Sequence, residues 1–248
     1  MIEFAGIRSD EKYVIVEHYP QRKFPKRKYT VQTIPGRSGD LYIDEAEDAF
    51  ENYEDSYTVF LDAKAPGLQE VSRGLAEWLL SPVGYQRLED SYDPDTYRMA
   101  IYTGGDNFVN IFNEYGRGTL KFNCAPKRFY KSGESEIVLT PNIPVYSPSS
   151  FKARPLYIVT TTGTSSVPRN ISLFIRDNTQ AVTRQFNINN VYGTITIDTE
   201  RHTIRGSANF DSNFVSGQYE DMYMGKSTQF GWSAYVSSVK VIPRWWTI

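Results

Sequence analysis

The chain has 248 residues, of which 40% are apolar and 15% aromatic, and its formal net charge at pH 7 is -2. This near-neutral balance argues against nucleic acid as a bound partner, because phosphate binding needs an excess of Lys and Arg on one face. The sequence contains no run of about 18 apolar residues that could span a membrane. Its opening, MIEFAGIRSD, has neither the basic nor the apolar region of a secretory signal, so we expect synthesis in a cytoplasm and no membrane partner.

Charge is distributed unevenly along the chain, which indicates two domains. Residues 1–135 carry 17 basic and 22 acidic side chains, whereas residues 136–248 carry 10 basic and 7 acidic ones. Between them, residues 131–155 contain Pro141, Pro144, Pro148 and Pro155, a composition typical of a linker. The sequence therefore predicts one domain over residues 1–135 and a second over 136–248, each long enough for its own core.

The first domain is predicted to be α+β, with a sandwich-like or barrel-like sheet. Short runs rich in Tyr, Val, Ile and Thr predict strands at residues 13–16, 29–34, 57–61 and 98–102. Residues 108–112 and 119–124 flank a glycine-containing connection and predict a β-hairpin.

One segment of this domain has a helical pattern. Apolar residues recur at Leu68, Val71, Leu75, Trp78 and Leu79, which is the spacing of one helix face. Ser81-Pro82 ends the pattern, because the residue before a proline disfavours the α conformation. The sequence predicts one helix over residues 68–80.

The second domain is predicted to contain only strands. They are expected at residues 156–160, 171–175, 193–198, 202–205 and 235–241, separated by Gly, Asn and Ser. Short strands with frequent turns are typical of a β-sandwich. The whole chain is thus expected to be mainly β.

The residues that usually carry out catalysis are sparse. His18 and His202 are far apart, the phosphate-loop and G-x-S-x-G motifs are absent, and Cys124 alternates with Leu120 and Phe122 like a small buried apolar residue. We therefore expect no enzyme, no metal and no cofactor. Glu89, Asp90, Asp93 and Asp95 form an acidic loop for which three interpretations stay open: a solvated turn, a calcium site or a carboxylate pair for glycoside hydrolysis.

Two clusters of like charge suggest an interface. Arg22, Lys23, Lys26, Arg27 and Lys28 form a basic cluster, and an acidic cluster begins with Asp44, Glu45, Glu47 and Asp48 and continues to residue 55. They are either ordinary solvated surface or complementary patches that meet head-to-tail between copies of the chain. Between the clusters, Pro35, Gly36, Arg37 and Gly39 predict a turn that either contacts a partner or is a plain turn.

Arg244, Trp245 and Trp246, near the end of the sequence, are predicted to form an anchor. Two Trp rings in water would be unfavourable, so we expect them to be docked. The alternatives are docking on the same chain, on a neighbouring subunit, or use of the rings as a platform for a sugar.

These features, taken in order, resemble the distal tail proteins (Dit) of siphophages that infect Gram-positive bacteria. The resemblance rests on Phe4-x-Gly6, the basic stretch 22–28, Ile34-Pro35-Gly36-Arg37-Ser38-Gly39, the helix ending in Trp78-Leu79, Phe122-Asn123-Cys124-Ala125-Pro126 and the closing Val241-Ile242-Pro243-Arg244-Trp245-Trp246. It covers nearly the whole chain. Ser38 stands where the family often has Asp.

The resemblance implies a structural function. Its members build a homo-hexameric ring from the N-terminal domain and carry an outer, galectin-like C-terminal β-sandwich. The ring connects the major tail (tube) protein to a tail-associated lysin or tail fibre, with receptor-binding or baseplate proteins as further partners. Its channel leaves room for DNA to pass without specific binding, at the distal tip of the virion's tail.

Two other classes of function remain open from the residues alone. A carbohydrate-binding module would use Trp232, Trp245 or Trp246 as stacking platforms for cell-wall glycans. A glycoside hydrolase would depend on the acidic loop alone.

Overall fold

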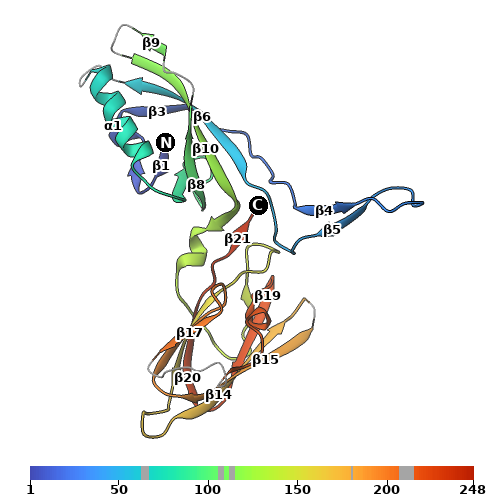
Figure 1. Cartoon of the computed structure of the whole chain (residues 1–248). Coiled ribbons are helices and arrows are strands. Elements are labelled where there is room, and N and C mark those ends of the chain that lie inside the picture. The colour runs from blue at the N-terminus through green and yellow to red at the C-terminus, as the bar shows by residue number, and fades with distance from the viewer. Residues whose placement is uncertain (63–66, 106–108, 112–114, 180, 207–214) are drawn as a thin grey trace. The chain divides into compact units, whose positions relative to one another are not determined.

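The computed structural model describes residues 1–62, 67–105, 109–111, 115–179, 181–206 and 215–248. They form two compact units (Figure 1). The first comprises Met1–Arg128 together with Ile248, and the second comprises Phe129–Thr247.

The first unit is organised around one large antiparallel sheet. Seven of its strands follow the order β2-β1-β7-β8-β10-β6-β3, and β9 adds to β10. The strands are β1 (Ile2–Phe4), β2 (Ile7–Arg8), β3 (Val14–His18), β6 (Tyr53–Asp62), β7 (Gln86–Asp90), β8 (Thr96–Gly104), β9 (Val109–Ile111) and β10 (Tyr115–Tyr130), with a short 3-10 turn η1 (Asp10–Lys12). The longest register joins β6 and β10, from Tyr53 opposite Cys124 to Asp62 opposite Tyr115.

One helix, α1 (Leu68–Leu80), covers this sheet (Figure 1). It starts after Gly67, whose φ of 86° is a left-handed conformation that suits glycine, and it ends before Pro82. Val71, Leu75, Trp78 and Leu79 are buried in the same cluster as strand residues such as Phe4. Trp78 also donates a hydrogen bond of 2.9 Å from Nε1 to the carbonyl oxygen of Phe4, which ties the helix to β1.

A separate two-stranded hairpin projects from this unit (Figure 1). It consists of β4 (Tyr29–Gln32) and β5 (Leu41–Asp44), which pair antiparallel with Tyr29 opposite Asp44 and Val31 opposite Tyr42. Among the described strands, these two pair only with each other. We call residues 29–44 the arm, and the segments 22–28 and 45–55 that lead into and out of it the stem.

The second unit is a sandwich of two five-stranded antiparallel sheets. One sheet has the order β11-β20-β13-β16-β17 and the other has β12-β19-β14-β15-β18. Their bounds are β11 (Ile137–Val138), β12 (Val145–Tyr146), β13 (Leu156–Thr161), β14 (Arg169–Asp177), β15 (Val182–Val191), β16 (Thr194–Asp198), β17 (Thr203–Gly206), β18 (Val215–Ser216), β19 (Ser227–Trp232) and β20 (Val236–Ile242). Two 3-10 turns, η2 (Lys131–Glu134) and η4 (Tyr219–Met222), are also present, and β21 (Trp246–Thr247) pairs with β10, whose last residues belong to this unit.

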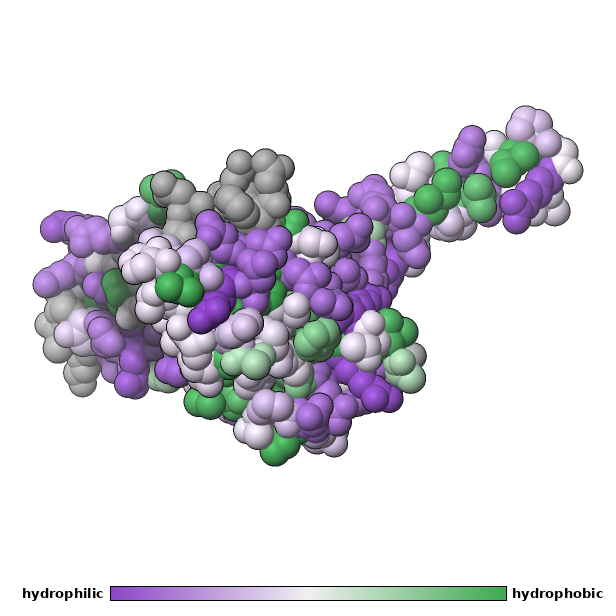
Figure 2. All heavy atoms as spheres, turned by 90° about the horizontal axis from the view of Figure 1, so that it is seen from below, coloured by the Kyte–Doolittle hydropathy of each residue, from purple (hydrophilic) through white to green (hydrophobic). Residues whose placement is uncertain are grey.

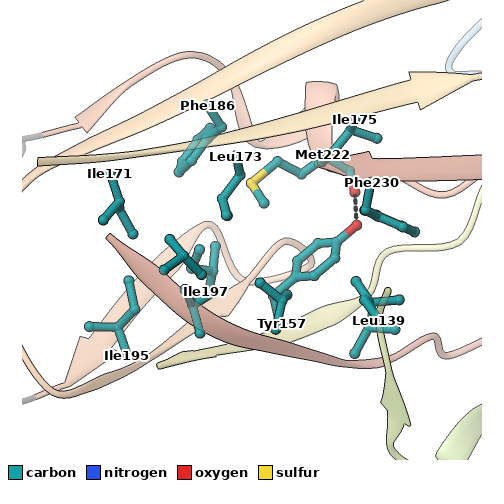
Figure 3. Packing of buried hydrophobic residues seen from close by; sticks show 14 of the residues in the cluster. Leu139, Tyr157, Ile171, Leu173, Ile175, Phe186, Ile195, Ile197, Met222 and Phe230 are labelled. Carbon is teal, nitrogen blue, oxygen red and sulfur yellow. Dashed lines mark hydrogen bonds between the residues drawn. The ribbon is translucent and has the colours of Figure 1, made fainter. Parts of the chain in front are cut away.

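The core of the sandwich forms where the inner faces of its two sheets meet (Figure 3). Ile171, Leu173 and Ile175 of β14 face Tyr157 of β13 and Ile197 of β16. The Tyr157 hydroxyl is the polar group in this apolar layer, and it donates a hydrogen bond of 2.8 Å to the carbonyl oxygen of Met222. Burial of this phenol therefore leaves no unsatisfied donor.

The predicted fold class is confirmed, while several local predictions need correction. The helix is found at the expected residues, and the second unit has no α-helix among its described residues. Residues 131–155 are not a free linker, because they supply β11, β12 and the buried core residues Leu139 and Ala153. The predicted hairpin pairs β9 with a β10 that already begins at Tyr115; residues 108 and 112–114 lie outside the described residues.

Candidate interaction site

The predicted turn lies at the tip of the arm. Gly36 and Gly39 both have φ of 81°, so both need the left-handed conformation that residues with a Cβ rarely adopt. The backbone N–H of Arg37 donates to the Ile34 carbonyl at 3.1 Å, and the Thr33 hydroxyl donates to Asp40 Oδ1 at 2.8 Å. The sequence I-P-G-R-S-G thus closes a hairpin and places its residues at the far end of a projecting element.

One face of the arm is apolar and exposed to solvent. Because directly opposite residues share a face, Tyr29, Val31 and Tyr42 lie together, and the rings of Tyr29 and Tyr42 meet edge to face with centroids 5.7 Å apart. Their exposed fractions are 46%, 52% and 62%. Figure 2 shows apolar residues along the projecting arm between polar ones. Isolated two-stranded hairpins are marginal in water, so the exposed apolar face of this arm is a candidate interaction surface.

The structure brings the two charge clusters together within one chain, in the stem. The backbone of Lys28 donates to the Ala49 carbonyl at 3.0 Å, and that of Glu51 donates to the Lys26 carbonyl at 2.7 Å. Arg27 donates to the Glu47 carbonyl at 2.9 Å. The basic and acidic segments are therefore two antiparallel sides of the same stem. Whether they also meet between copies stays a prediction.

Three basic side chains of the stem, Arg22, Lys23 and Arg27, donate hydrogen bonds to backbone oxygens rather than to carboxylates. Lys23 donates to the Glu54 carbonyl, and Arg22 donates to the backbone oxygen of Ile248 at 2.6 Å. Asp48 pairs with Lys127 of β10 at 2.6 Å. Asp44 and Glu45 are exposed, and neither carboxylate has a hydrogen bond or ion pair within the described part of the chain.

A buried charge cluster lies inside the first unit, and sequence reasoning missed it. Arg98 of β8 is 2% exposed, and its Nη2 donates to Asp90 Oδ2 at 2.9 Å and to the Tyr57 hydroxyl. Its Nε lies 3.0 Å from Asp55 Oδ2, although the geometry of that contact is not that of a hydrogen bond. Arg128 of β10 is 5% exposed and approaches Asp55 at 3.7 Å.

Burial and the arginines act in opposite directions on the pKa values of these carboxyls. Burial raises the pKa of Asp55 in spite of Arg98 and Arg128. Burial also acts on Asp90, but Arg98, the Tyr57 hydroxyl and the backbone N–H of Asp93 outweigh it and lower the pKa of Asp90. Burial raises the pKa of the Cys124 thiol to about 12, so this cysteine is an inert core residue, as expected.

The acidic loop is not simply a solvated turn. Asp90 is 8% exposed, and its Oδ1 accepts backbone N–H bonds from Tyr92 at 3.1 Å and Asp93 at 2.9 Å. Asp93 accepts a hydrogen bond from the Thr96 hydroxyl. Asp90 therefore holds the loop to Arg98, a function that the strand alternation Thr96, Arg98, Ala100 could have revealed, since it places Arg98 on the inward face.

The C-terminal residues dock on their own unit. Arg244 binds Asp198 through two nitrogens, at 2.8 and 3.0 Å. Trp246 is 3% exposed, stacks on Phe151 with centroids 4.5 Å apart and donates from Nε1 to the Lys152 carbonyl at 2.9 Å. Trp245 is 8% exposed and packs in the sandwich core. Neither ring offers a free face to a sugar.

Over the described residues there is no group of three or more His, Cys, Asp or Glu side chains that could hold a metal ion. The single described α-helix is too short and too polar to cross a membrane. The described residues thus form a mainly β protein of two units, the first of which carries a projecting arm.

Comparison with known proteins identifies the fold. The chain is similar in structure to the Dit protein of phage SPP1, described as a paradigm of the hub adsorption apparatus of phages that infect Gram-positive bacteria. The TM-score is 0.73 at 12% sequence identity, over 97% of this chain and 96% of that one. A chain of the phage p2 baseplate in its activated conformation with Sr is similar with a TM-score of 0.50 at 9% identity, over 92% and 89% of the two chains. No protein-family model matches the sequence, and no curated protein is similar to it in sequence.

Proposed function

We propose that this chain is a distal tail protein, a structural hub of the phage tail tip that works by assembly and has no reaction centre. The observation that carries the proposal is the similarity in fold to SPP1 Dit over nearly the full length of both chains. The order of short motifs along the sequence, from Phe4-x-Gly6 to Trp245-Trp246, supports it independently.

In this proposal six copies form a ring through residues 1–135, and residues 136–248 form an outer, galectin-like sandwich. The ring connects the tail tube protein to a tail-associated lysin or fibre and leaves a channel for DNA. The arm supports an assembly function, because its apolar face of Tyr29, Val31 and Tyr42 is exposed in the single chain. A second copy that covers this face would remove apolar area from water, at about 25 cal/mol per Å².

Negative-stain imaging of the purified full-length chain tests the proposal. We expect six-fold rings, and we expect reversal of the charges of Lys26, Arg27 and Lys28 to reduce the fraction of rings in low salt. The matched control reverses three basic residues outside the stem, Lys121, Arg205 and Lys240. A folded wild-type chain that forms no closed ring would refute the hub assignment.

A carbohydrate-binding module is the competing function, and the structure offers it little support. The stacking platforms expected from the sequence were Trp232, Trp245 and Trp246, whereas Trp245 and Trp246 are buried and Trp232 is partly buried against the sandwich core. A glycan-binding assay on the imaged sample would separate the two functions.

A further inference from the structure

A cleft in the first unit opens onto the buried charge cluster. It has a volume of about 260 Å³ and is lined by Arg22, Tyr92, Asp93 and, at its inner end, by Asp90, Arg98 and Arg128. This volume lies below the roughly 300–1,000 Å³ of pockets that enclose drug-sized ligands. The cleft suits one side-chain head group rather than a larger molecule.

Arg128 lines this cleft without a hydrogen bond. Its side chain is 6% exposed, and its guanidinium contacts two carboxylates, Asp55 Oδ2 at 3.7 Å and Asp93 Oδ2 at 3.9 Å. Both distances exceed the 2.7–3.2 Å of an N–H···O hydrogen bond. No other polar contact of this side chain occurs among the described residues, apart from the Tyr53 ring 5.8 Å from its Cζ. A guanidinium has five N–H donors. The Arg128 nitrogens are not among the fully enclosed polar atoms, so these donors are accessible from the cleft.

The acceptors on the cleft wall are already engaged. Asp90 Oδ2 accepts from Tyr57 at 2.8 Å and from Arg98 at 2.9 Å, and its Oδ1 accepts two backbone N–H groups. Asp93 Oδ2 accepts from Thr96 at 2.8 Å. The cleft therefore has spare donors on Arg128, and Arg22 at its mouth adds a second guanidinium. A planar carboxylate matches such donors, whereas a doubly charged phosphate would be repelled more strongly by Asp90 and Asp93.

We propose that this cleft binds the carboxylate of an acidic side chain from a second copy of the chain, supplied by Asp44 or Glu45 at the place where the arm of that copy joins its stem. The proposal rests on the proposed function, since it needs assembled copies. Charge complementarity supports the choice of occupant: these two carboxylates are exposed and have no partner within the described residues, and the cleft holds a buried guanidinium that needs an acceptor. The contact would pair Arg128 of one copy with one carboxylate from the acidic cluster of the next copy.

Disulfide trapping between chains tests the assignment. One chain carries Arg22→Cys, a second, size-tagged chain carries Glu45→Cys, and the two are mixed and mildly oxidised. Cys124 is fully buried and does not compete. We expect a covalent dimer of one tagged and one untagged chain, and at least tenfold less of it when Glu51→Cys, also in the acidic part of the stem, replaces Glu45→Cys.

Neutralisation provides a second measurement that does not depend on folding of a core variant. The double variant Asp44→Asn with Glu45→Gln changes only exposed side chains, and we expect it to weaken self-association at least tenfold. We expect the same loss from Arg128→Gln. The control, Glu51→Gln with Glu54→Gln, should have little effect. Rings that form with no preferred cross-link and no response to Asp44→Asn with Glu45→Gln would overturn the cleft assignment and leave the hub function intact. A wild-type chain that never self-associates would overturn both. A third outcome would also overturn the proposal. If millimolar acetate stabilises the monomer, if Arg128→Gln abolishes this stabilisation, and if Asp44→Asn with Glu45→Gln has no effect on self-association, the cleft is a site for a small anion from solution.

Discussion

Arg98 and Asp90 are joined by a 2.9 Å hydrogen bond in a place where neither side chain has more than 5% of its surface in water. The arginine also faces Asp55, which is fully buried, so one cation is shared between two interior carboxylates. Such a cluster is expensive to bury but very damaging to break, because removal of one partner leaves an uncompensated charge.

Arg98→Met should therefore destabilise the first unit by about 3–5 kcal/mol, which is the range for breaking a buried ion pair. Urea unfolding, monitored by hydrogen exchange of the backbone amides in β6 and β8, measures the change in the free energy of unfolding. The control is Arg117→Met, which removes an exposed pair with Glu17 and should cost little. If both variants lost the same free energy of unfolding, the buried cluster would contribute no more to stability than an exposed ion pair.

In the second unit, the Arg244–Asp198 contact should make stability depend on pH on the acid side. Hydrogen bonds from Arg244 lower the pKa of Asp198 below its ordinary value. The unfolded chain then binds a proton more readily than the folded one, so the stabilisation is present above about pH 4 and is lost as the pH falls through the lower, folded pKa. Asp198→Asn should be less stable than wild type at pH 7, with the difference shrinking toward pH 3. A difference that stays constant over this range in thermal unfolding would contradict the assignment.

At the tip of the arm, Gly39→Ala should disturb the hairpin without weakening the main sheet. A left-handed conformation costs a residue with a Cβ about 1–2 kcal/mol, and Gly39 has φ of 81°. We expect faster hydrogen exchange in β4 and β5 and unchanged exchange in β10. Ser38→Ala is the matched control, and an identical exchange pattern in both variants would argue against a glycine-dependent turn.

The apolar face of the arm should control self-association. Val31→Asp with Tyr42→Asp places charges on the face that carries Tyr29, whereas Thr30→Asp with Gln32→Asp places them on the opposite face. Each apolar side chain buried at an interface contributes about 1.5–3 kcal/mol, so the first pair should weaken association more than tenfold. Sedimentation velocity at several concentrations compares them. Thr30 and Gln32 lie opposite Ile43 and Leu41, so the same loss from the second pair would show that the face with Tyr29 has no preferred part in association.

The sequence predicted well those elements whose pattern is local. The helix over residues 68–80 was confirmed because its apolar spacing and Ser81-Pro82 are signals within one segment. β15 (Val182–Val191) and β19 (Ser227–Trp232) were missed because their sequences mix Asn, Gln, Ser and Gly with few apolar residues, and only their partners in the sheet make them strands. β1, with three residues, is too short to show any alternation.

The candidate site was predicted only in part, because tertiary pairing decides it. Ile34–Gly39 was recognised as a turn. The sequence could not show that the two charge clusters lie on the two sides of one stem, because this follows from the pairing of β4 with β5, which brings Lys28 to Ala49. Asp55 was assigned to the acidic cluster and Asp90 to the acidic loop, and the sequence did not show that both are buried. Their burial follows from the strand register that turns both side chains inward toward Arg98. Asp55 precedes Arg98 by 43 positions in the chain and Asp90 precedes it by 8, so these contacts depend on the tertiary fold.

The proposed function requires that copies of this chain assemble with one another through the first unit. Sedimentation equilibrium of the purified, full-length protein measures this most directly, because it gives the mass in solution without reference to shape. We expect a mass six times that of the 28.4 kDa chain, and we expect this mass to fall toward that of a single chain when Val31 and Tyr42 are replaced by Asp. A folded wild-type chain that keeps the mass of one copy at high concentration would contradict it.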